Sequence, residues 1–306
     1  MIVPASSDAL HRAAHIIRHG GLVAFPTETV YGLGANALDA EAVRRIYDAK
    51  QRPFASPLIV HVTDTEMARS VTAEWPAVAD RLAKRFWPGP LTLVIKKSEV
   101  VPDLVTAGLG TVGVRVPANP IATELIRQSG VPIAAPSANL FGQISPTTAE
   151  HVWAGLGDRV AMILDGGATK VGIESTVVAL RNDGPVVLRP GMISQSELEE
   201  ATHVRWEQEL NVPEIRDADE SPGQQARHYA PRTPLYVLEA GMARPNGRGR
   251  VLAMPRDRKK FAASLYAELH KADSEGLEWI AIEAPPDTGE WAGIADRLRR
   301  ASKHEN

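Results

Sequence analysis

Residues 21–35 read Gly-Leu-Val-Ala-Phe-Pro-Thr-Glu-Thr-Val-Tyr-Gly-Leu-Gly-Ala, and this stretch decides the fold. Its apolar start is long enough for a buried strand, which leads directly into a Pro-Thr-Glu-Thr turn. The turn presents hydroxyl groups and the carboxylate of Glu28 at a strand end. Because open α/β sheets bind ligands at strand ends, we predict a ligand site beside this turn.

The segment after the turn has the periodicity of an amphipathic helix and ends in two cations. Ala42 and Ile46 share one side of this helix, and Lys50 and Arg52 follow at its end. Hydroxyls facing two cations suit a phosphate or carboxylate, because arginine binds planar oxyanions through two bonds and lysine supplies a point charge. Cations at a helix end also satisfy terminal carbonyls and the helix dipole, so this stretch alone leaves both interpretations open.

The composition is that of an ordinary globular protein. The chain has 306 residues, of which 44% are hydrophobic and 23% charged, and this length favours two domains over one large one. A formal net charge of -3 gives no global basic surface for nucleic acid, so any RNA contact would be a local patch. The absence of cysteine excludes disulfides, thiolate metal sites and a cysteine nucleophile.

The sequence shows no sign of export or membrane insertion. Its N-terminus lacks the basic flank and apolar core of a signal peptide, and no apolar run reaches the roughly 18 residues that span a bilayer. Together with the absence of cysteine, these features predict a cytoplasmic protein without a membrane contact.

Strand patterns and helix patterns alternate along the chain, which predicts an α/β fold. Before residue 204, the expected strands cover residues 22–25, 58–62, 91–95, 112–116, 131–135, 162–164, 176–180 and 186–189. Helical patterns cover residues 7–19 and 65–86, begin again near residue 149, and follow a capping box that starts at Ser194.

The C-terminal part repeats this alternation on a smaller scale. Strands are expected at 235–238, 250–254 and 279–282, with helices around 261–269 and 294–300. This pattern predicts a small parallel α/β domain. Residues 205–234 lose all periodicity and are rich in proline, glycine and acidic residues, as in a linker. We therefore divide the chain into a catalytic domain (1–204), a linker over the active site (205–234) and a C-terminal domain (235–306).

Three expected strands carry a side chain that is unusual for a buried strand. His61 stands near the end of one, and Arg115 and Arg189 lie in or at the end of two others. A lone histidine in a strand is usually a satisfied core group, so His61 gains functional weight only if it faces Thr29. A buried arginine needs an anionic partner, which leaves a ligand contact and a structural ion pair open for Arg115.

Polar side chains gather at two further places. Ser137, Asn139 and Ser145 lie between a strand and the next helix, where free backbone N–H groups favour phosphate, although Ser145 is also typical of a helix cap. In the linker, His228 and Tyr229 stand between turn-forming residues. An imidazole and a phenol in such a segment suit a chain laid over a ligand.

These motifs, taken in order, resemble the YrdC-like threonylcarbamoyl-AMP synthase family over about residues 5–200. The matching motifs are Pro26-Thr27-Glu28-Thr29-Val30-Tyr31-Gly32-Leu33, Lys50-x-Arg52, Pro57-Leu58-Ile59-Val60-His61, Pro88-Gly89-Pro90-Leu91-Thr92, Val114-Arg115-Val116-Pro117, Ala135-Pro136-Ser137-Ala138-Asn139, Ser145-Pro146-Thr147, Glu174-Ser175-Thr176 and Leu188-Arg189-Pro190-Gly191. The linker from Ser221 to Pro231 resembles the long form of the family. The resemblance implies a YrdC-like twisted open α/β sheet with a concave ligand site, and a Rossmann-like C-terminal domain.

The resemblance also implies a reaction. Members of the family make L-threonylcarbamoyladenylate and pyrophosphate from L-threonine, bicarbonate and ATP, and Mg²⁺ accompanies the ATP. The product passes to the threonylcarbamoyl transferase complex, which forms threonylcarbamoyladenosine (t6A) next to the anticodon of tRNA. A weak contact with tRNA would fit this role.

Carried over position by position, the resemblance assigns residue roles. L-Threonine would be held by Thr29, His61, Arg115 and Ser175. ATP would be held by Arg52, Ser56, Thr111, Ser137, Asn139, Ser145, Arg189 and Tyr229. Lys50 and Arg52 form the family's KxR signature and are the expected catalytic residues. Ser56 departs from the pattern, because asparagine is usual at this position.

The residues fit catalysis by positioning and charge stabilisation, since no nucleophile–base pair or acidic metal cage is evident. One alternative is an RNA-binding module of the same fold without chemistry. The cations alternate with threonine and serine rather than with stacking aromatics, and aromatics are only 5% of the chain, which argues against it. A second alternative, a carbamoyl-transferring enzyme of hydrogenase maturation, would be expected to carry zinc-finger cysteines.

Overall fold

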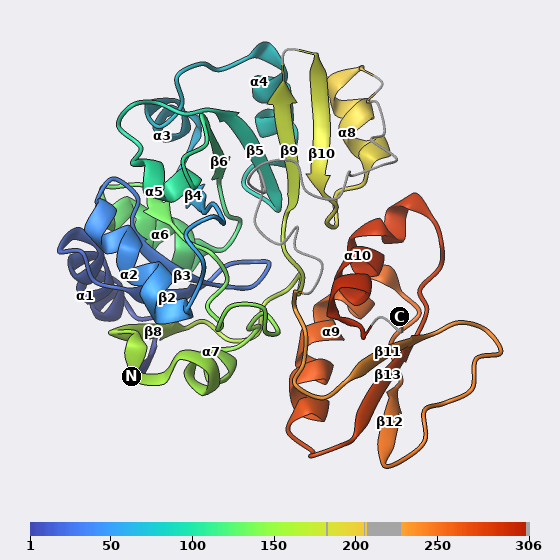
Figure 1. Cartoon of the computed structure of the whole chain (residues 1–306). Helices are drawn as coiled ribbons and strands as arrows, with labels where there is room; N and C mark the ends of the chain where they lie inside the picture. Colours follow the sequence, from blue (N-terminus) through green and yellow to red (C-terminus); the bar gives the residue numbers. More distant parts are fainter. Residues whose placement is uncertain (182, 205, 207–227, 304–306) are drawn as a thin grey trace.

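The computed structural model describes residues 1–181, 183–204, 206 and 228–303 of the chain. Figure 1 shows a large α/β unit formed by the N-terminal part and a small one formed by the C-terminal part. This arrangement confirms the predicted fold class. No helix in the described ranges combines the length and the hydropathy that a bilayer crossing requires.

The large unit is organised on a mixed sheet with the strand order β1-β8-β2-β3-β7-β4-β6-β5-β9-β10. The strands are β1 (Ile2–Pro4), β2 (Val23–Pro26), β3 (Tyr31–Asn36), β4 (Ile59–His61), β5 (Leu91–Lys96), β6 (Thr111–Arg115), β7 (Ile133–Ala134), β8 (Met162–Asp165), β9 (Thr176–Arg181) and β10 (Gly184–Arg189). β2 and β3 pair antiparallel, so the Pro-Thr-Glu-Thr turn is the tip of a hairpin. β4 and β6 pair in parallel and place His61 opposite Arg115.

Helices pack on the sheet and bury its apolar side chains. They are α1 (Ser7–Arg18), α2 (Ala40–Lys50), α3 (Thr65–Ser70), α4 (Ala77–Phe86), α5 (Asp103–Thr106), α6 (Pro120–Ser129), α7 (Ala149–Leu156), the short η1 (Gly157–Arg159) and α8 (Gln195–Thr202). α1 and α6 bury Val23 and Phe25 of β2. Ala24 belongs to a second cluster, with α2, α4 and α8. Neighbouring residues of a strand point to opposite faces, so both faces of the sheet are covered.

The glycine-rich strand β3 was not expected from the sequence. Glycine, which is depleted in strands, stands at positions 32 and 34 and hides the strand pattern. The packing explains the glycine at 34, since a Cβ atom there would lie 2.7 Å from the Phe25 ring and 2.8 Å from the Ile133 side chain. The short edge strand β1 and helix α6 were also missed.

Two helix boundaries also differ from the expectation. The single helix expected over residues 65–86 is divided, because α3 ends at Ser70 and Pro76 precedes the first turn of α4. Proline lacks the N–H that would continue the earlier helix. The cap of α7 is Thr148, whose side chain accepts from the His151 N–H, so Ser145 is not the cap. The capping box that starts at Ser194 is confirmed at α8.

The small C-terminal unit is a parallel three-stranded sheet with two α-helices and a short 3-10 helix, in agreement with the predicted α/β fold. Its strands β11 (Leu235–Leu238), β12 (Gly249–Leu252) and β13 (Trp279–Glu283) run in the order β11-β13-β12. The helices are α9 (Arg258–Asp273), the short η2 (Gly289–Trp291) and α10 (Ala292–Ala301). Leu265 and Leu298 from α9 and α10 bury Ile280 and Ile282 of the central strand.

The two units pack closely against each other. Val30, Ile173 and Tyr229 share one buried cluster with side chains of α9 and α10. Backbone approaches backbone at Gly293 of α10, where a Cβ atom would lie 2.4 Å from the carbonyl oxygen of Gly191. Most of the predicted linker, residues 205 and 207–227, lies outside the described residues, so only its end can be placed.

Candidate active site

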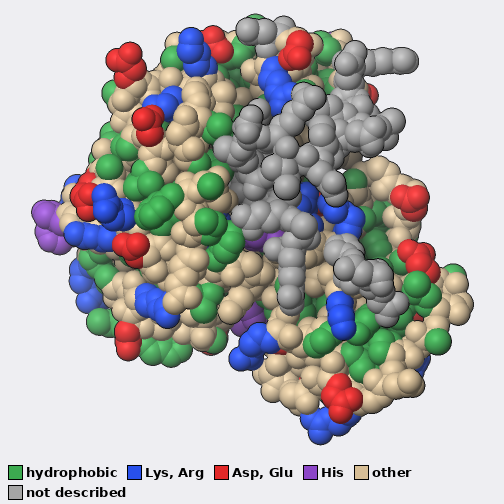
Figure 2. All heavy atoms as spheres, viewed as in Figure 1, with side chains coloured by type: hydrophobic (Ala, Val, Ile, Leu, Met, Phe, Trp, Pro, Cys, Tyr) green, Lys and Arg blue, Asp and Glu red, His purple; other side chains and the backbone are tan. Residues whose placement is uncertain are grey.

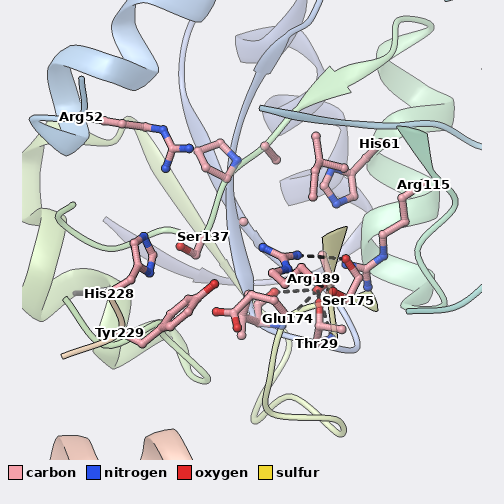
Figure 3. Close-up of a pocket in the computed structure, with 16 residues that line it drawn as sticks. Thr29, Arg52, His61, Arg115, Ser137, Glu174, Ser175, Arg189, His228 and Tyr229 are labelled. Atoms are coloured by element: carbon pink, nitrogen blue, oxygen red, sulfur yellow. Dashed lines mark hydrogen bonds between the residues drawn. The ribbon is translucent and has the colours of Figure 1, made fainter. Parts of the chain in front are cut away.

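A pocket lies at the strand ends of the large sheet, where the C-terminal unit meets it (Figure 3). Figure 2 shows lysine or arginine and histidine side chains gathered at this junction. The predicted site residues that line the pocket are Thr29, Arg52, His61, Arg115, Ser137, Ser175, Arg189 and Tyr229. The structure therefore brings together side chains that are up to two hundred positions apart in the sequence.

The hairpin tip between β2 and β3 forms one wall of the pocket. The Thr27 hydroxyl donates to the Val30 carbonyl at 2.6 Å and lies 2.8 Å from the Thr29 hydroxyl. Both threonine side chains are buried. Since Thr27 closes the turn, it fixes the place of the Thr29 hydroxyl, which is the one predicted to meet a ligand.

Arg115 stands beside the hairpin tip and has an anionic partner. Its Nη2 lies 2.6 Å from Glu28 Oε1, and its Nε donates to the Gly89 carbonyl at 3.2 Å. The contact with Glu28 is a close charge pair without hydrogen-bond alignment, because neither Nη2 nor Oε1 has a hydrogen-bond partner among the described residues. Arg115 therefore forms a structural ion pair and also lines the pocket.

His61 lies next to Arg115 and lines the same pocket as Thr29, as its functional interpretation requires (Figure 3). It is only 4% exposed. Burial, together with the charge of Arg115, lowers the pKa of His61 to about 3. The imidazole is therefore neutral near pH 7, and its Nδ1 has no hydrogen-bond partner in the described part of the chain.

Arg52 supplies the cation of the opposite wall. Its Nη2 donates to the Ser56 hydroxyl and to the Pro57 carbonyl, and its guanidinium lies 5.6 Å from the centre of the Phe141 ring. Ser56 does not itself line the pocket, but it holds Arg52. The serine that departs from the family pattern is therefore linked to the site through this arginine.

Lys50 lies behind the pocket wall rather than in it. Its Nζ donates to the carbonyls of Ser137 and Asn139, and the side chain is 1% exposed. Burial, together with the charge of Arg52, lowers the pKa of Lys50 well below its ordinary value. The side-chain amide of Asn139 donates in turn to the carbonyls of Leu140 and Gln143. Lys50 and Asn139 thus fix the loop that presents Ser137 to the pocket.

Glu174 is a pocket residue that was not among the predicted site residues. It immediately precedes Ser175, and its carboxylate is fully engaged. Ser145 donates to Oε1 at 2.5 Å, while Tyr266 and Arg297 of the C-terminal unit donate to Oε2 at 3.0 and 2.7 Å. Burial alone would raise the pKa of Glu174, but Arg297, Arg189 and the hydrogen bonds lower it below its ordinary value. The acid is therefore ionised.

Ser175 and Arg189 follow at the ends of β9 and β10. The Ser175 hydroxyl lies 2.8 Å from that of Thr92 and accepts from Arg189 Nη2 at 3.2 Å. Arg189 Nε donates to the Ser175 carbonyl, and only 4% of this arginine is exposed. Burial lowers the pKa of Arg189 below its ordinary value, but guanidinium remains charged at any physiological pH.

His228 and Tyr229, at the end of the predicted linker, close the remaining side of the pocket (Figure 3). Tyr229 has φ of +61°, a left-handed conformation that is strained for a tyrosine. Neither the Tyr229 hydroxyl nor His228 Nδ1 has a hydrogen-bond partner among residues that the structure describes. Burial lowers the pKa of His228 to about 3, against the opposing charge of Glu174. Both side chains thus present neutral polar atoms to the pocket.

Five of the predicted residues do not reach the pocket wall: Lys50, Ser56, Thr111, Asn139 and Ser145. Four of them support the wall through the hydrogen bonds described above. Thr111 is different, because it begins β6 while Arg115 ends it, so the strand holds Thr111 away from the pocket. Across the described ranges, no three His, Asp or Glu side chains cluster in a way that could hold a metal ion.

Two family models and several known proteins match the sequence of this chain. A family model described as telomere recombination matches residues 15–191, and a model described as the C-terminal domain of threonylcarbamoyl-AMP synthase matches residues 193–303. The threonylcarbamoyl-AMP synthase of Pyrococcus abyssi is 42% identical over 316 residues, which cover 95% of this chain and 93% of that protein. That of Bacillus subtilis is also 42% identical, over 322 residues, which cover 95% of this chain and 92% of that protein.

Solved structures give the same result. The crystal structure of P. abyssi Sua5 complexed with L-threonine superposes with a TM-score of 0.91 at 39% identity, and the match covers 99% of this chain and 97% of that one. Both domains are therefore shared, in the same order and arrangement. The chain belongs to the Sua5/YrdC family of threonylcarbamoyl-AMP synthases, in the long form that carries the C-terminal domain.

Proposed function

We propose that this chain makes L-threonylcarbamoyladenylate and pyrophosphate from L-threonine, bicarbonate and ATP. The observation that carries the proposal is one pocket with two cationic ends, Arg115 beside the Thr29 turn and Arg52 with Arg189 beside Tyr229. A carboxylate at one end and phosphates at the other would place an amino acid and a nucleotide in one pocket. The two ends correspond to the two substrates that have to react.

L-Threonine would occupy the end formed by Thr29, His61, Arg115 and Ser175. Arg115 is ion-paired with Glu28 through Nη2, and its guanidinium also lines the pocket, where it would meet the carboxylate of threonine. The neutral imidazole of His61 offers Nδ1 to a polar group without adding charge. The carboxylate of Glu28 offsets the charge of Arg115, so this end would suit a zwitterionic amino acid better than a multiply charged anion.

ATP would occupy the other end. Arg52, Ser137, Arg189 and Tyr229 would contact it directly, while Ser56, Asn139 and Ser145 would act through the side chains and loops that they hold. The assignment of Thr111 to ATP stays a prediction, and β6 holds this residue away from the pocket wall. Of the two residues expected to be catalytic, Arg52 would bear on the phosphates and Lys50 would fix the Ser137 loop.

The chemistry requires no covalent intermediate with the enzyme. The amino group of threonine forms a carbamate, either with bicarbonate, which releases water, or with CO2, which releases a proton. A carbamate oxygen then attacks the α-phosphorus of ATP, and the bond to pyrophosphate breaks. Negative charge grows on the phosphate oxygens as the bond to pyrophosphate breaks, so Arg52 and Arg189 would stabilise it. Burial of the pocket residues strengthens these interactions, because the local dielectric is low.

Mg²⁺ would enter as part of the ATP substrate. The acidic side chains nearest to the pocket, Glu28 and Glu174, are both paired with arginine, so neither offers a free carboxylate. The phosphates themselves would therefore supply the oxygen ligands, with water completing the octahedral shell that Mg²⁺ prefers.

The remaining predictions follow from this reaction. The product would pass to a threonylcarbamoyl transferase complex acting on tRNA, which places the enzyme in the cytoplasm, with at most a weak tRNA contact of its own. The catalytic domain would comprise residues 1–204 and the C-terminal domain residues 235–306, joined by the linker at 205–234.

The test is pyrophosphate release from ATP and Mg²⁺, with and without L-threonine and with and without bicarbonate. We expect release that requires both, and a product with the mass of threonylcarbamoyl-AMP. Release that ignores threonine, or none from a folded sample, would contradict the proposal. A salt-dependent tRNA titration would then test the RNA-binding alternative.

A further inference from the structure

The C-terminal unit reaches the pocket through one fully buried cation, Arg297 of α10. Its Nε donates to Glu174 Oε2 at 2.7 Å and its Nη2 to the Glu174 carbonyl at 3.4 Å. Its Nη1 donates to the carbonyl of Pro190 at 2.9 Å. The guanidinium carbon also lies 5.2 Å from the centre of the Tyr229 ring. One side chain thus contacts three separate segments of the pocket wall.

Each of these segments carries a residue of the proposed ATP end. Glu174 receives the Ser145 hydroxyl and precedes Ser175, whose hydroxyl accepts from Arg189. Pro190 directly follows Arg189 in the chain. Tyr229 itself lines the pocket with a hydroxyl that has no partner within the described ranges. Ser175 of the proposed L-threonine end follows Glu174, but among the described residues no hydrogen bond of Arg297 reaches a side chain of that end.

The surrounding charges hold this guanidinium in one orientation. Within its own helix, Arg297 donates to Asp296 Oδ2 at 2.8 Å, and the other oxygen of that carboxylate accepts from Arg299 and Arg300. On the opposite side stands Glu174, which also accepts from the Tyr266 hydroxyl. A buried ion pair adds little net stability to a domain interface, because the cost of desolvating both charges offsets their attraction. The apolar cluster shared by α9, α10 and Val30 already joins the units.

We propose that Arg297 is a positioning residue through which the C-terminal domain sets the ATP end of the pocket. The inference rests on the proposed function, since it names the residue that links one domain to the nucleotide site of the other. When Arg297 holds Glu174, Pro190 and Tyr229 together, the ATP contacts are formed before ATP arrives. Nucleotide binding and docking of the C-terminal domain are then coupled, and by linkage each strengthens the other to the same degree.

The test replaces the forked guanidinium by a single ammonium in Arg297→Lys, which keeps the charge but cannot reach three segments at once. The matched control is Arg299→Lys, on the same helix, because Arg299 also pairs with Asp296 but is 58% exposed and does not line the pocket. The measurements are KM for ATP and for L-threonine, kcat, and the dissociation constants of L-threonine and of a non-hydrolysable ATP analogue by calorimetry.

For Arg297→Lys we expect the analogue's dissociation constant and the KM for ATP to rise about tenfold or more, with L-threonine affinity within about twofold of wild type. Bound analogue should protect the domain junction of the wild type from proteolysis more than that of Arg297→Lys. The Arg299→Lys variant should behave as wild type. A purely structural role predicts instead a lower melting temperature and fewer active molecules, with both affinities unchanged.

Unchanged analogue affinity in folded Arg297→Lys would overturn the inference and leave the proposed function intact. If Arg297→Lys does not fold, Tyr266→Phe replaces it, because this change removes only the hydroxyl that donates to Glu174 and keeps the ring in the core. It should weaken analogue binding a few-fold, and unchanged binding would again overturn the inference. Failure of the wild type to make product would refute the proposed function, which is a separate outcome.

Discussion

Moderate acid should destabilise the folded chain, because three histidines are held neutral by their surroundings. The pKa of His61 and that of His228 are each lowered to about 3, and that of His270 to about 4, in every case chiefly by burial. The first two are only 4% and 5% exposed. His270, on α9, stacks on His151 of α7 with ring centres 3.9 Å apart, across the junction of the two units. That neighbouring imidazole also lowers the pKa of His270.

The direction in which stability changes with pH follows from the protons bound by the folded and unfolded states. Between the lowered pKa in the folded state and about 6.5 in the unfolded state, the unfolded chain binds more protons, so the free energy of unfolding falls as the pH falls through this window. At about pH 5.5, a histidine that protonates only when unfolded lowers stability by about 1.4 kcal/mol, against less than about 0.1 kcal/mol at about pH 7.5. Three such residues together give a loss of about 4 kcal/mol.

The assay is urea unfolding followed by circular dichroism at the two pH values. One variant, His270→Gln, keeps an amide that can donate to the Ser145 carbonyl, which the imidazole contacts at 3.2 Å, but it cannot be protonated. Its stability should fall by about 1.4 kcal/mol less than that of the wild type between these pH values. Equal stability of the wild type at both pH values would refute the reasoning.

Three further predictions test the pocket and the domain junction. Arg52→Ala should lower the rate of pyrophosphate release by roughly two orders of magnitude or more, with an unchanged circular dichroism spectrum, and near-normal release would exclude a phosphate role. Glu28→Gln leaves the buried Arg115 without its anion, which should cost about 3–5 kcal/mol of stability, and L-threonine should raise the melting temperature of this variant more than that of the wild type. Gly293→Ala should destabilise domain docking by about 1–3 kcal/mol in calorimetry, because the new Cβ would meet the loop after β10, whereas Gly289→Ala, where a Cβ meets nothing within 4 Å, should have no such effect.

The fold was largely predictable because its strands are apolar runs and its helices are amphipathic and capped. The parts that were missed have different causes. In β3, glycine is needed because a larger residue would collide with the Phe25 side chain on the neighbouring strand. The residue types of β3 are therefore set by packing and not by the alternation that usually marks a strand. The division at Pro76 could have been read from the sequence, since proline seldom continues a helix.

The sequence predicts which segments lie near the pocket, but not which of their side chains line it. A motif such as Lys50-x-Arg52 or Ser137-x-Asn139 places two alternate residues near the ligand, but it does not say which one faces it. In the structure Arg52 and Ser137 line the pocket, while Lys50 and Asn139 hold the backbone behind them. The direction of each side chain depends on hydrogen bonds to loops far away in the sequence, which no local pattern records.

Glu174 shows why partners across domains matter for the chemistry. In the sequence it was only a polar residue before a strand, and a lone carboxylate beside a phosphate site would suggest a metal ligand. The structure gives it a different role, because Ser145 binds one of its oxygens, and Tyr266 and Arg297 bind the other. A carboxylate saturated in this way is a poor Mg²⁺ ligand, since coordination would have to displace a buried hydrogen bond. The C-terminal domain thus converts a potential metal ligand into a support for the pocket wall.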